Sequence, residues 1–331
     1  MLPGLIDLAS ELVGGEALSA SDEFFAPKEN LLLAKPPVLV SDKYTDRGKW
    51  MDGWESRRKR TPGHDWCVIR LGLPGVVRTV DVDTSYFVGN FPEHCSLDGA
   101  SVAGDPAERD WKPLLSKVRL AGGGHNVFDA QPAGRLTHVR LNIFPDGGVA
   151  RLRLYGEVIP DLEKLRTSPE PVDVASVVNG GRVLASSDNF FGHEQNLILP
   201  GRPANMGGGW ETRRRRGPGY DWIIVQLGAR AQVQKISVET EHYKGNYPDR
   251  CSIDLCDTRG DACDAAGTLF QDLTTGKVAW TEILPEAKLE ANAVRQFESE
   301  LKAIPAATHV RLNIYPDGGV SRLRVFGKIV E

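Results

Sequence analysis

Apolar and polar residues alternate with a period of two in several short stretches of the chain, as expected for strands with one buried face. The alternation is clearest at residues 139–143 and 151–154, and further apolar runs cover 66–72 and 76–82. Turn residues such as those at 145–148 separate these runs. Short strands joined by tight turns predict an all-β fold of the β-sandwich or jelly-roll type. The chain shows no regular alternation of strands and helices, which disfavours a nucleotide-binding sheet.

The same pattern occurs twice along the chain, which is the sequence signature of a duplicated domain. Three blocks return in order: 7–25 as 173–191, 53–66 as 209–222, and 137–149 as 308–320. We therefore expect two tandem domains, one in residues 1–160 and one in residues 173–331. Residues 161–172 between them are polar and contain prolines, which is typical of a linker.

The distance between equivalent blocks changes from 166 to 156 and then to 171 positions. The first copy therefore carries 10 additional residues near 33–49, and the second carries 15 additional residues between 256 and 307. Insertions of this size are tolerated in surface loops. Within the second insertion, residues 286–302 contain helix formers with apolar residues four positions apart, which predicts a short helix.

Composition narrows the function and the compartment. The 40 basic and 44 acidic residues give a net charge of −4, which excludes a broadly basic nucleic-acid binder and gives no attraction to an anionic membrane surface. No stretch reaches the roughly 20 apolar residues of a membrane span, and the amino terminus lacks the features of a secretory signal. The five cysteines match neither a zinc-ribbon nor a CxxC pattern, so we expect reduced thiols in a cytoplasmic protein.

The most conspicuous polar stretch is the Arg-rich loop, residues 53–66, which reads Gly-Trp-Glu-Ser-Arg-Arg-Lys-Arg and ends in His64-Asp65-Trp. A guanidinium from Arg57 or Arg58 matches a carboxylate with two parallel hydrogen bonds. Glu55 or Asp65 is a candidate for moving a proton. The alternative is that these charges are solvated or pair with one another, and that the loop tryptophans belong to the core.

Some residues occur in one copy only, and others in both. His64 becomes Tyr220 in the second copy, so His64 beside Asp65 is the preferred acid–base pair of an asymmetric site. Asn142 and Arg151, around the turn at 145–148, occur in both copies. Their presence in both copies is compatible with a structural role and with a ligand-binding role. No metal-binding motif is present, so we predict no cofactor. The sequence does not exclude a divalent metal bound by carboxylates from both sides of a domain or subunit interface.

Taken together, the motifs resemble the allantoicase family. The resemblance rests on Ser-Asp-x-Phe-Phe, Gly-Trp-Glu-[Ser/Thr]-Arg-Arg-[Lys/Arg]-Arg, Gly-Asn-[Phe/Tyr]-Pro and Arg-Leu-Asn-Ile-[Phe/Tyr]-Pro-Asp-Gly-Gly-Val, each present in both copies. It implies two jelly-roll domains resembling the galactose-binding-like fold. It also implies a cytoplasmic homo-oligomer that hydrolyses allantoate to ureidoglycolate and urea in purine catabolism, a reaction at a non-peptide C–N bond of a linear amidine.

The substrate implied by the resemblance suggests roles for the loop residues. Arg57 or Arg58 would hold the carboxylate of allantoate, and an amide from Asn90 or Asn142 would bind a ureido group. Arg151 is a further candidate for substrate binding. Glu55 or Asp65 would act as the base and His64 as the proton donor or as an orienting group. The alternative function is a non-catalytic small-ligand protein of the carbohydrate-binding type. Two copies that fill the entire chain favour the enzyme.

Overall fold

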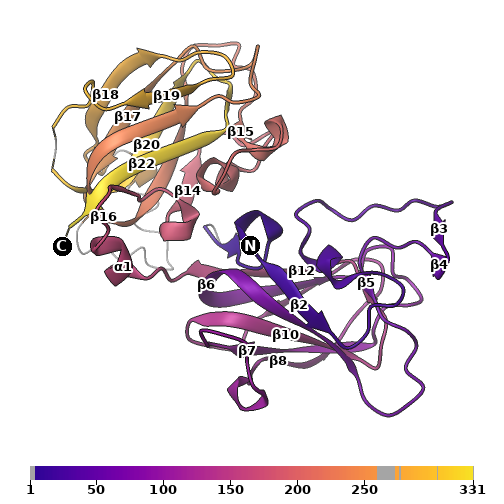
Figure 1. Ribbon diagram of the computed structural model, residues 1–331. Coiled ribbons are helices and arrows are strands. Elements are labelled where there is room, and N and C mark those ends of the chain that lie inside the picture. Colours follow the sequence, from indigo (N-terminus) through magenta and orange to yellow (C-terminus); the bar gives the residue numbers. More distant parts are fainter. Residues whose placement is uncertain (1–3, 259–272, 276, 304, 331) are drawn as a thin grey trace. The chain divides into compact units, whose positions relative to one another are not determined.

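The computed structural model describes residues 4–258, 273–275, 277–303 and 305–330. The chain forms two compact units (Figure 1), one covering Leu5–Ile159 and the other beginning at Pro160. The proposed linker, residues 161–172, contains the α-helix α1 (Leu162–Arg166). Each unit is built from antiparallel strands, which confirms the prediction of two tandem all-β domains of the jelly-roll type.

The first unit, called the first repeat below, contains one large sheet. Its strands run in the order β1-β12-β6-β10-β7-β8, and β2 and β9 also pair with β6. Their bounds are β1 (Ile6–Asp7), β2 (Glu16–Ala20), β6 (Asp65–Asp83), β7 (His94–Ala100), β8 (Lys112–Arg119), β9 (His125–Asp129), β10 (Leu136–Phe144) and β12 (Arg151–Val158). The short pairs are β3 (Tyr44–Thr45) with β4 (Gly48–Lys49), and β5 (Trp54–Glu55) with β11 (Gly148–Val149). Single 3₁₀ turns are η1 (Glu11–Val13), η2 (Lys28–Leu32) and η3 (Glu108–Asp110).

Strand β6 is long enough to belong to both layers of the sandwich. Its first part, to Arg70, pairs with β2 and β10, and its last part, from Gly75, pairs with β12 and β9. Apolar side chains at alternate positions face the core between the layers, and Cys67, Ile69, Val80 and Val82 have no exposed surface. The intervening side chains therefore lie on the outer faces of the two layers.

The second unit, the second repeat, has the same strand order: β13-β22-β16-β20-β17-β18, with β14 and β19 paired to β16. Its strands are β13 (Val172–Asp173), β14 (Arg182–Ser186), β16 (Asp221–Glu239), β17 (Arg250–Cys256), β18 (Thr281–Lys288), β19 (Val294–Phe297), β20 (Ala307–Tyr315) and β22 (Arg322–Ile329), with the short pair β15 (Trp210–Glu211) and β21 (Gly319–Val320). Its 3₁₀ turns are η4 (Val177–Asn179), η5 (Glu194–Ile198) and η6 (Met206–Gly208).

The insertion of the first repeat contains the short strands β3 and β4, and the helix predicted at 286–302 was wrong. These residues contain the end of β18 and all of β19; the buried Leu289 directly follows β18, and the buried Phe297 is the last residue of β19. Strands β7 and β17 are 156 positions apart, whereas β8 and β18 are 169 apart. Thirteen of the additional residues therefore lie between β17 and β18, upstream of the predicted helix.

Two further predictions concern cysteines and membranes. Cys67, Cys95, Cys251 and Cys256 are buried free thiols, and Cys263 lies outside the described residues. Burial raises the pKa of each of these four thiols, which keeps them protonated and unreactive at neutral pH. Among the described residues, no helix has the length and apolar character that a membrane span requires.

The turn between β10 and β11 depends on a glycine. Gly147 has φ of +137°, and a Cβ added there would lie 2.7 Å from the Pro92 nitrogen and 2.8 Å from the Asn90 oxygen. Gly318 has the same φ at the equivalent turn of the second repeat. Only glycine fits this combination of backbone conformation and close approach, so the turn holds the chain around Asn90 in place.

We expect Gly147→Ala to lower the free energy of unfolding by about 1–3 kcal/mol because of backbone strain and overlap with the neighbouring loop. Gly134→Ala is the matched control, since an added Cβ there meets nothing within 4 Å. It should change stability by less than about 0.5 kcal/mol. Urea unfolding followed by circular dichroism measures both changes. Equal midpoints for Gly147→Ala and wild type would contradict this explanation of the turn.

Candidate active site

The first candidate site, called the loop cavity below, lies beside the Arg-rich loop of the first repeat. It has a volume of about 480 Å³, and three of the sequence-predicted residues, Glu55, Arg58 and Asn90, are among its lining residues. Pairing of β5 with β11 fixes Glu55 opposite Gly148. The Asn90 side-chain amide donates a hydrogen bond of 2.7 Å to Glu55 Oε1. Burial raises the pKa of Glu55, although the bond from Asn90 works in the opposite direction.

The second repeat reproduces the polar framework of the loop cavity. The amide of Asn246 donates to Glu211 at 2.6 Å, as Asn90 does to Glu55. Asp146 accepts a backbone N–H from the Arg-rich loop at 2.7 Å, and Asp317 accepts the equivalent N–H at 2.8 Å. These hydrogen bonds therefore stabilise the Arg-rich loop and its equivalent in the second repeat.

The structure places the other loop candidates outside the lining of this cavity. Asp65 is 1% exposed, and its Oδ1 accepts from Ser21 Oγ and Lys59 Nζ, both at 2.8 Å. His64 is exposed and packs against the Phe144 ring at a centroid distance of 4.6 Å. Arg57 is also exposed and pairs with Asp22. The loop thus directs Glu55 and Arg58 to the cavity while its remaining charges hold the loop or face solvent.

Asn142 and Arg151 lie elsewhere in the first repeat. The amide of Asn142 donates to Asp98 Oδ2 at 2.9 Å and to Ser96 Oγ at 3.2 Å, between strands β10 and β7. Asn313 makes the same bonds in the second repeat. Arg151 lines a different cavity from Glu55. The structure therefore brings together only part of the predicted set.

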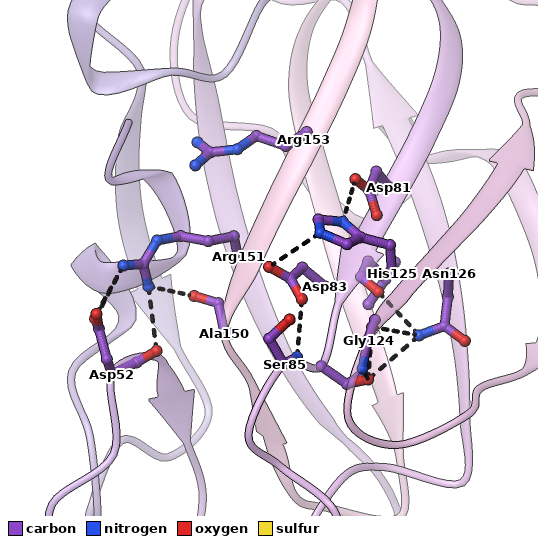
Figure 2. A network of polar contacts seen from close by, with 12 residues as sticks. Asp52, Asp81, Asp83, Ser85, Gly124, His125, Asn126, Ala150, Arg151 and Arg153 are labelled. Carbon is purple, nitrogen blue, oxygen red and sulfur yellow. Dashed lines mark hydrogen bonds and ion pairs between the residues drawn. The ribbon is translucent and has the colours of Figure 1, made fainter. Parts of the chain in front are cut away.

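That second cavity, called the dyad cavity below, lies on the outer face of the layer formed by β12, β6 and β9. It has a volume of about 350 Å³. In the strand register Asp83 is paired with Arg151 on one side and with His125 on the other, and Asp81 is paired with Arg153. Because directly paired residues share a face, these side chains converge on one surface (Figure 2). Tyr86 and the segment containing Pro36 and Pro37 complete the lining.

The dyad cavity takes its name from a hydrogen-bonded histidine and aspartate. His125 Nδ1 lies 2.8 Å from Asp81 Oδ2, and this bond raises the pKa of His125. Burial raises the pKa of Asp81, whose Oδ1 is buried and has no hydrogen-bond partner among the described residues. His125 Nε2 lies 4.0 Å from Asp83 Oδ2, and Asp83 Oδ1 accepts the Ser85 N–H at 2.8 Å. The Nδ1 edge of the imidazole is thus fixed, while the His125 side chain is 63% exposed and accessible to a ligand.

The two arginines anchor the insertion of the first repeat over the dyad cavity. Arg151 is 2% exposed and donates to both carboxylate oxygens of Asp52 at 3.0 Å. It also donates to the backbone oxygens of Asp52, Ala150 and Lys35. Arg153 donates to Asp7 Oδ2 at 3.3 Å and to two carbonyl oxygens of the inserted segment. Arg151 therefore holds the cavity wall, in addition to lining the cavity.

Within the part of the chain that the structure describes, the second repeat does not reproduce the dyad at the equivalent positions. The strand register places Ser237 at the position of Asp81, Glu239 at that of Asp83 and Val294 at that of His125. Like His64, His125 occurs in one copy only. His125 was not predicted as a site residue because it follows a run of glycines, and because sequence does not show which strand it pairs with. The described residues contain no group of three or more His, Cys, Asp or Glu side chains placed to share a metal ion.

Comparison with known proteins gives consistent matches. A family model described as an allantoicase repeat matches residues 6–159 and again residues 172–330. A protein of Burkholderia mallei named probable allantoicase 1 is 48% identical over 327 residues, which is 98% of this chain and 94% of that protein. The probable allantoicase of Pseudomonas aeruginosa is 49% identical, with coverages of 98% and 96%. The crystal structure of allantoicase from Saccharomyces cerevisiae is 32% identical, covers 98% of this chain and 93% of that one, and gives a TM-score of 0.79.

The dyad geometry predicts a shift that is measurable in solution. Since the Asp81 carboxylate stabilises the protonated imidazole, the pKa of His125 should lie above the usual value of about 6.5. Asp81→Asn should lower it, because an amide carries no charge. Glu239→Gln in the second repeat is the control and should leave the pKa of His125 unchanged. NMR titration of ¹³C-labelled histidine measures both, and an unchanged pKa in Asp81→Asn would show that the dyad does not form.

Proposed function

The chain belongs to the allantoicase family, and from this premise we propose that it hydrolyses allantoate to ureidoglycolate and urea. The observation that carries the proposal is the match of the family model to both repeats, together with relatives named allantoicase that are matched over almost their whole length. The carbohydrate-binding alternative has no comparable support, because fold alone does not determine function.

We further propose that the protein acts in purine catabolism as a cytoplasmic homo-oligomer. The buried, unpaired cysteines of the described part of the chain suit a reducing compartment. Oligomerisation follows from the family resemblance and is developed below from a surface of the first repeat.

The reaction sets requirements that can be compared with the cavities. Allantoate carries a carboxylate and two ureido groups on one carbon. Water adds its oxygen to this carbon and loses a proton, while one C–N bond breaks and the departing nitrogen takes the electron pair and a proton. The site therefore needs a base for water, an acid for the leaving urea and a cation for the carboxylate.

The dyad cavity meets these requirements with residues from three adjacent strands. His125, kept protonated by Asp81, donates a proton from Nε2 to the departing urea nitrogen. Asp83, whose Oδ2 lies 4.0 Å from His125 Nε2, accepts the proton of the attacking water. Arg153 attracts the substrate carboxylate. At about 350 Å³ the cavity is large enough for a small, polar substrate.

Asp81 and Arg151 act in this proposal as positioning residues. Asp81 fixes the tautomer and orientation of the imidazole, and Arg151 holds the inserted segment that closes one side of the cavity. The pH dependence follows from the raised pKa of His125. Because the protonated imidazole is the active form, activity persists above the usual histidine range and falls as the pH rises through the pKa of His125.

The loop cavity is the second candidate for the reaction site. Its support is the raised pKa of Glu55, which suits a general base, next to Arg58 for a carboxylate and Asn90 for a ureido group. In this arrangement Asp65 and His64 on the same loop would supply or orient the acid. Arg57 and Asn142 remain the less favoured substrate contacts, because neither lines this cavity.

Urea release from allantoate by the purified protein tests the activity, and variants separate the two cavities. His125→Gln should lower kcat by about 10²- to 10⁴-fold, the usual contribution of a positioned acid. His64→Gln is the matched control in the same repeat and should keep kcat within about tenfold of wild type. Circular dichroism verifies that each variant is folded.

The opposite result would assign the reaction to the loop cavity. If Glu55→Gln lowers kcat by about 10²-fold or more while His125→Gln retains it, the reaction takes place in the loop cavity. Glu211→Gln, which changes the equivalent residue of the second repeat, controls for effects on loop structure alone. No urea release by the wild-type chain would overturn the proposed function itself.

A further inference from the structure

We propose that a groove on the first repeat binds an apolar segment of a second copy of the chain. The groove, called the tryptophan groove below, has a volume of about 470 Å³. It lies on the outer face of the layer that contains β2, the first part of β6, and β10. Trp66 and Val68 line it, whereas the alternate residues Cys67 and Ile69 face the core. This proposal develops the homo-oligomer of the proposed function and does not depend on which cavity is catalytic.

The walls of the groove combine apolar and charged side chains. Trp111 and Leu18 extend the apolar surface, and the guanidinium of Arg140 lies 5.0 Å from the centroid of the Trp111 ring. Asp105 and Glu108 line the same groove, and Glu108 pairs with Arg140 at 2.9 Å. The groove thus offers an apolar floor with the carboxylate of Asp105 and an ion pair beside it.

The second repeat shows what this surface accommodates. The strand register places Trp222, Ile224 and Leu184 at the positions of Trp66, Val68 and Leu18, and Trp280 at that of Trp111. There the surface is covered by Leu273, which is 2% exposed and packs with these residues in one cluster. The Trp280 indole N–H donates to the Leu273 carbonyl oxygen at 3.4 Å. A leucine and its backbone carbonyl are therefore a suitable occupant.

The first repeat cannot supply this cover from the same place in its sequence. Its β7–β8 connection is thirteen residues shorter than the β17–β18 connection that provides Leu273. As a result, Leu18 and Val68 are only half-buried, whereas Leu184 is 7% and Ile224 is 1% exposed. The groove of the first repeat is therefore open where its counterpart is filled.

The insertion of the first repeat contains a matching segment. Val38, Leu39 and Val40 are consecutive and are 52%, 50% and 41% exposed. The segment has no regular secondary structure, and the Val38 N–H is held by Asp52 Oδ2 at 2.9 Å. Lysines at 35 and 43 flank it, with Asp42 next to Lys43, and Lys35 carries the charge that complements Asp105 of the groove. Three adjacent exposed aliphatic residues form an unusual surface for a soluble protein and indicate a contact.

The segment and the groove lie on different sides of the first repeat. Figure 1 shows β3 and β4, which follow the segment, at one extremity of the unit, away from β7 and β8. The segment therefore reaches the groove of another copy and not its own. Two such contacts, each copy giving one segment and receiving one, form a closed two-fold dimer.

This contact also links assembly to the dyad cavity. Pro36 and Pro37 line that cavity and directly precede the segment. A second copy that holds Leu39 in its groove therefore fixes the chain that forms one wall of the dyad cavity. The partner thus stabilises the substrate-binding shape without contributing a catalytic residue.

Sedimentation velocity of the full chain tests the proposal. The wild-type chain should associate, and Leu39→Asp and Ser19→Arg should each raise the dissociation constant by at least about tenfold, because a charge then meets the apolar groove. Ser19 is exposed and lines the groove, so its replacement leaves the core intact. Val88→Asp is the control: Val88 is 75% exposed outside the groove, and its change should leave association unaltered. A monomeric wild type, or unchanged association of Leu39→Asp, overturns the proposal.

A cross-linking experiment tests the pairing itself. Leu39→Cys and Ser19→Cys are prepared as separate variants, mixed, and oxidised with copper phenanthroline. A disulfide-linked dimer should form in the mixture and in neither variant alone. No cross-link in the mixture, or the same cross-link in Leu39→Cys alone, contradicts the contact. Urea release by the same wild-type preparation separates the two proposals, since an active monomer overturns only the interface.

Discussion

The register of strand β6 is the constraint on which the remaining structure depends. Its two parts pair with different strands, so one continuous stretch sets the position of four neighbours. A shift by one residue would turn Val80 and Val82 outward and bury the charges of Asp81 and Asp83 in the core. The same register places Asp83 between His125 and Arg151 on the outer face of one layer. It places Trp66 and Val68 on the outer face of the other layer. Core, candidate site and proposed interface therefore follow from one pairing pattern.

The two repeats keep this framework and differ in what they build on it. Both hold their loops with a glutamate–asparagine pair, and both place a buried tryptophan, Trp54 or Trp210, whose indole N–H donates to a backbone carbonyl. The first repeat has the histidine–aspartate dyad, which the described residues of the second repeat lack at the equivalent positions, and the insertion held by Arg151. The second repeat alone covers its tryptophans with Leu273. The first repeat thus carries a polar cavity and an open groove.

The sequence was sufficient for the features that recur in both repeats. Alternating apolar residues predicted the strands, and the duplicated blocks predicted two similar domains, because both signals are local. Glu55, Arg58 and Asn90, which the sequence suggested as site residues, line one cavity, and their role stays a proposal. His125 was missed since its contact with Asp81, 44 positions away, arises only from strand pairing. The helix predicted at 286–302 failed because its spaced apolar residues serve different elements: Leu289 is buried in the turn after β18, and Phe297 is buried at the end of β19.

The central claim is that each chain has one reaction site, in the dyad cavity of the first repeat. Isothermal titration calorimetry measures the number of sites directly when ureidoglycolate is titrated into the wild-type chain. Ureidoglycolate is suitable because it is a product that this reaction does not hydrolyse further. We expect one bound molecule per chain, with binding weakened in Arg153→Gln, which removes the cation proposed to attract the carboxylate. Two bound molecules per chain, or unchanged binding in Arg153→Gln, would contradict it.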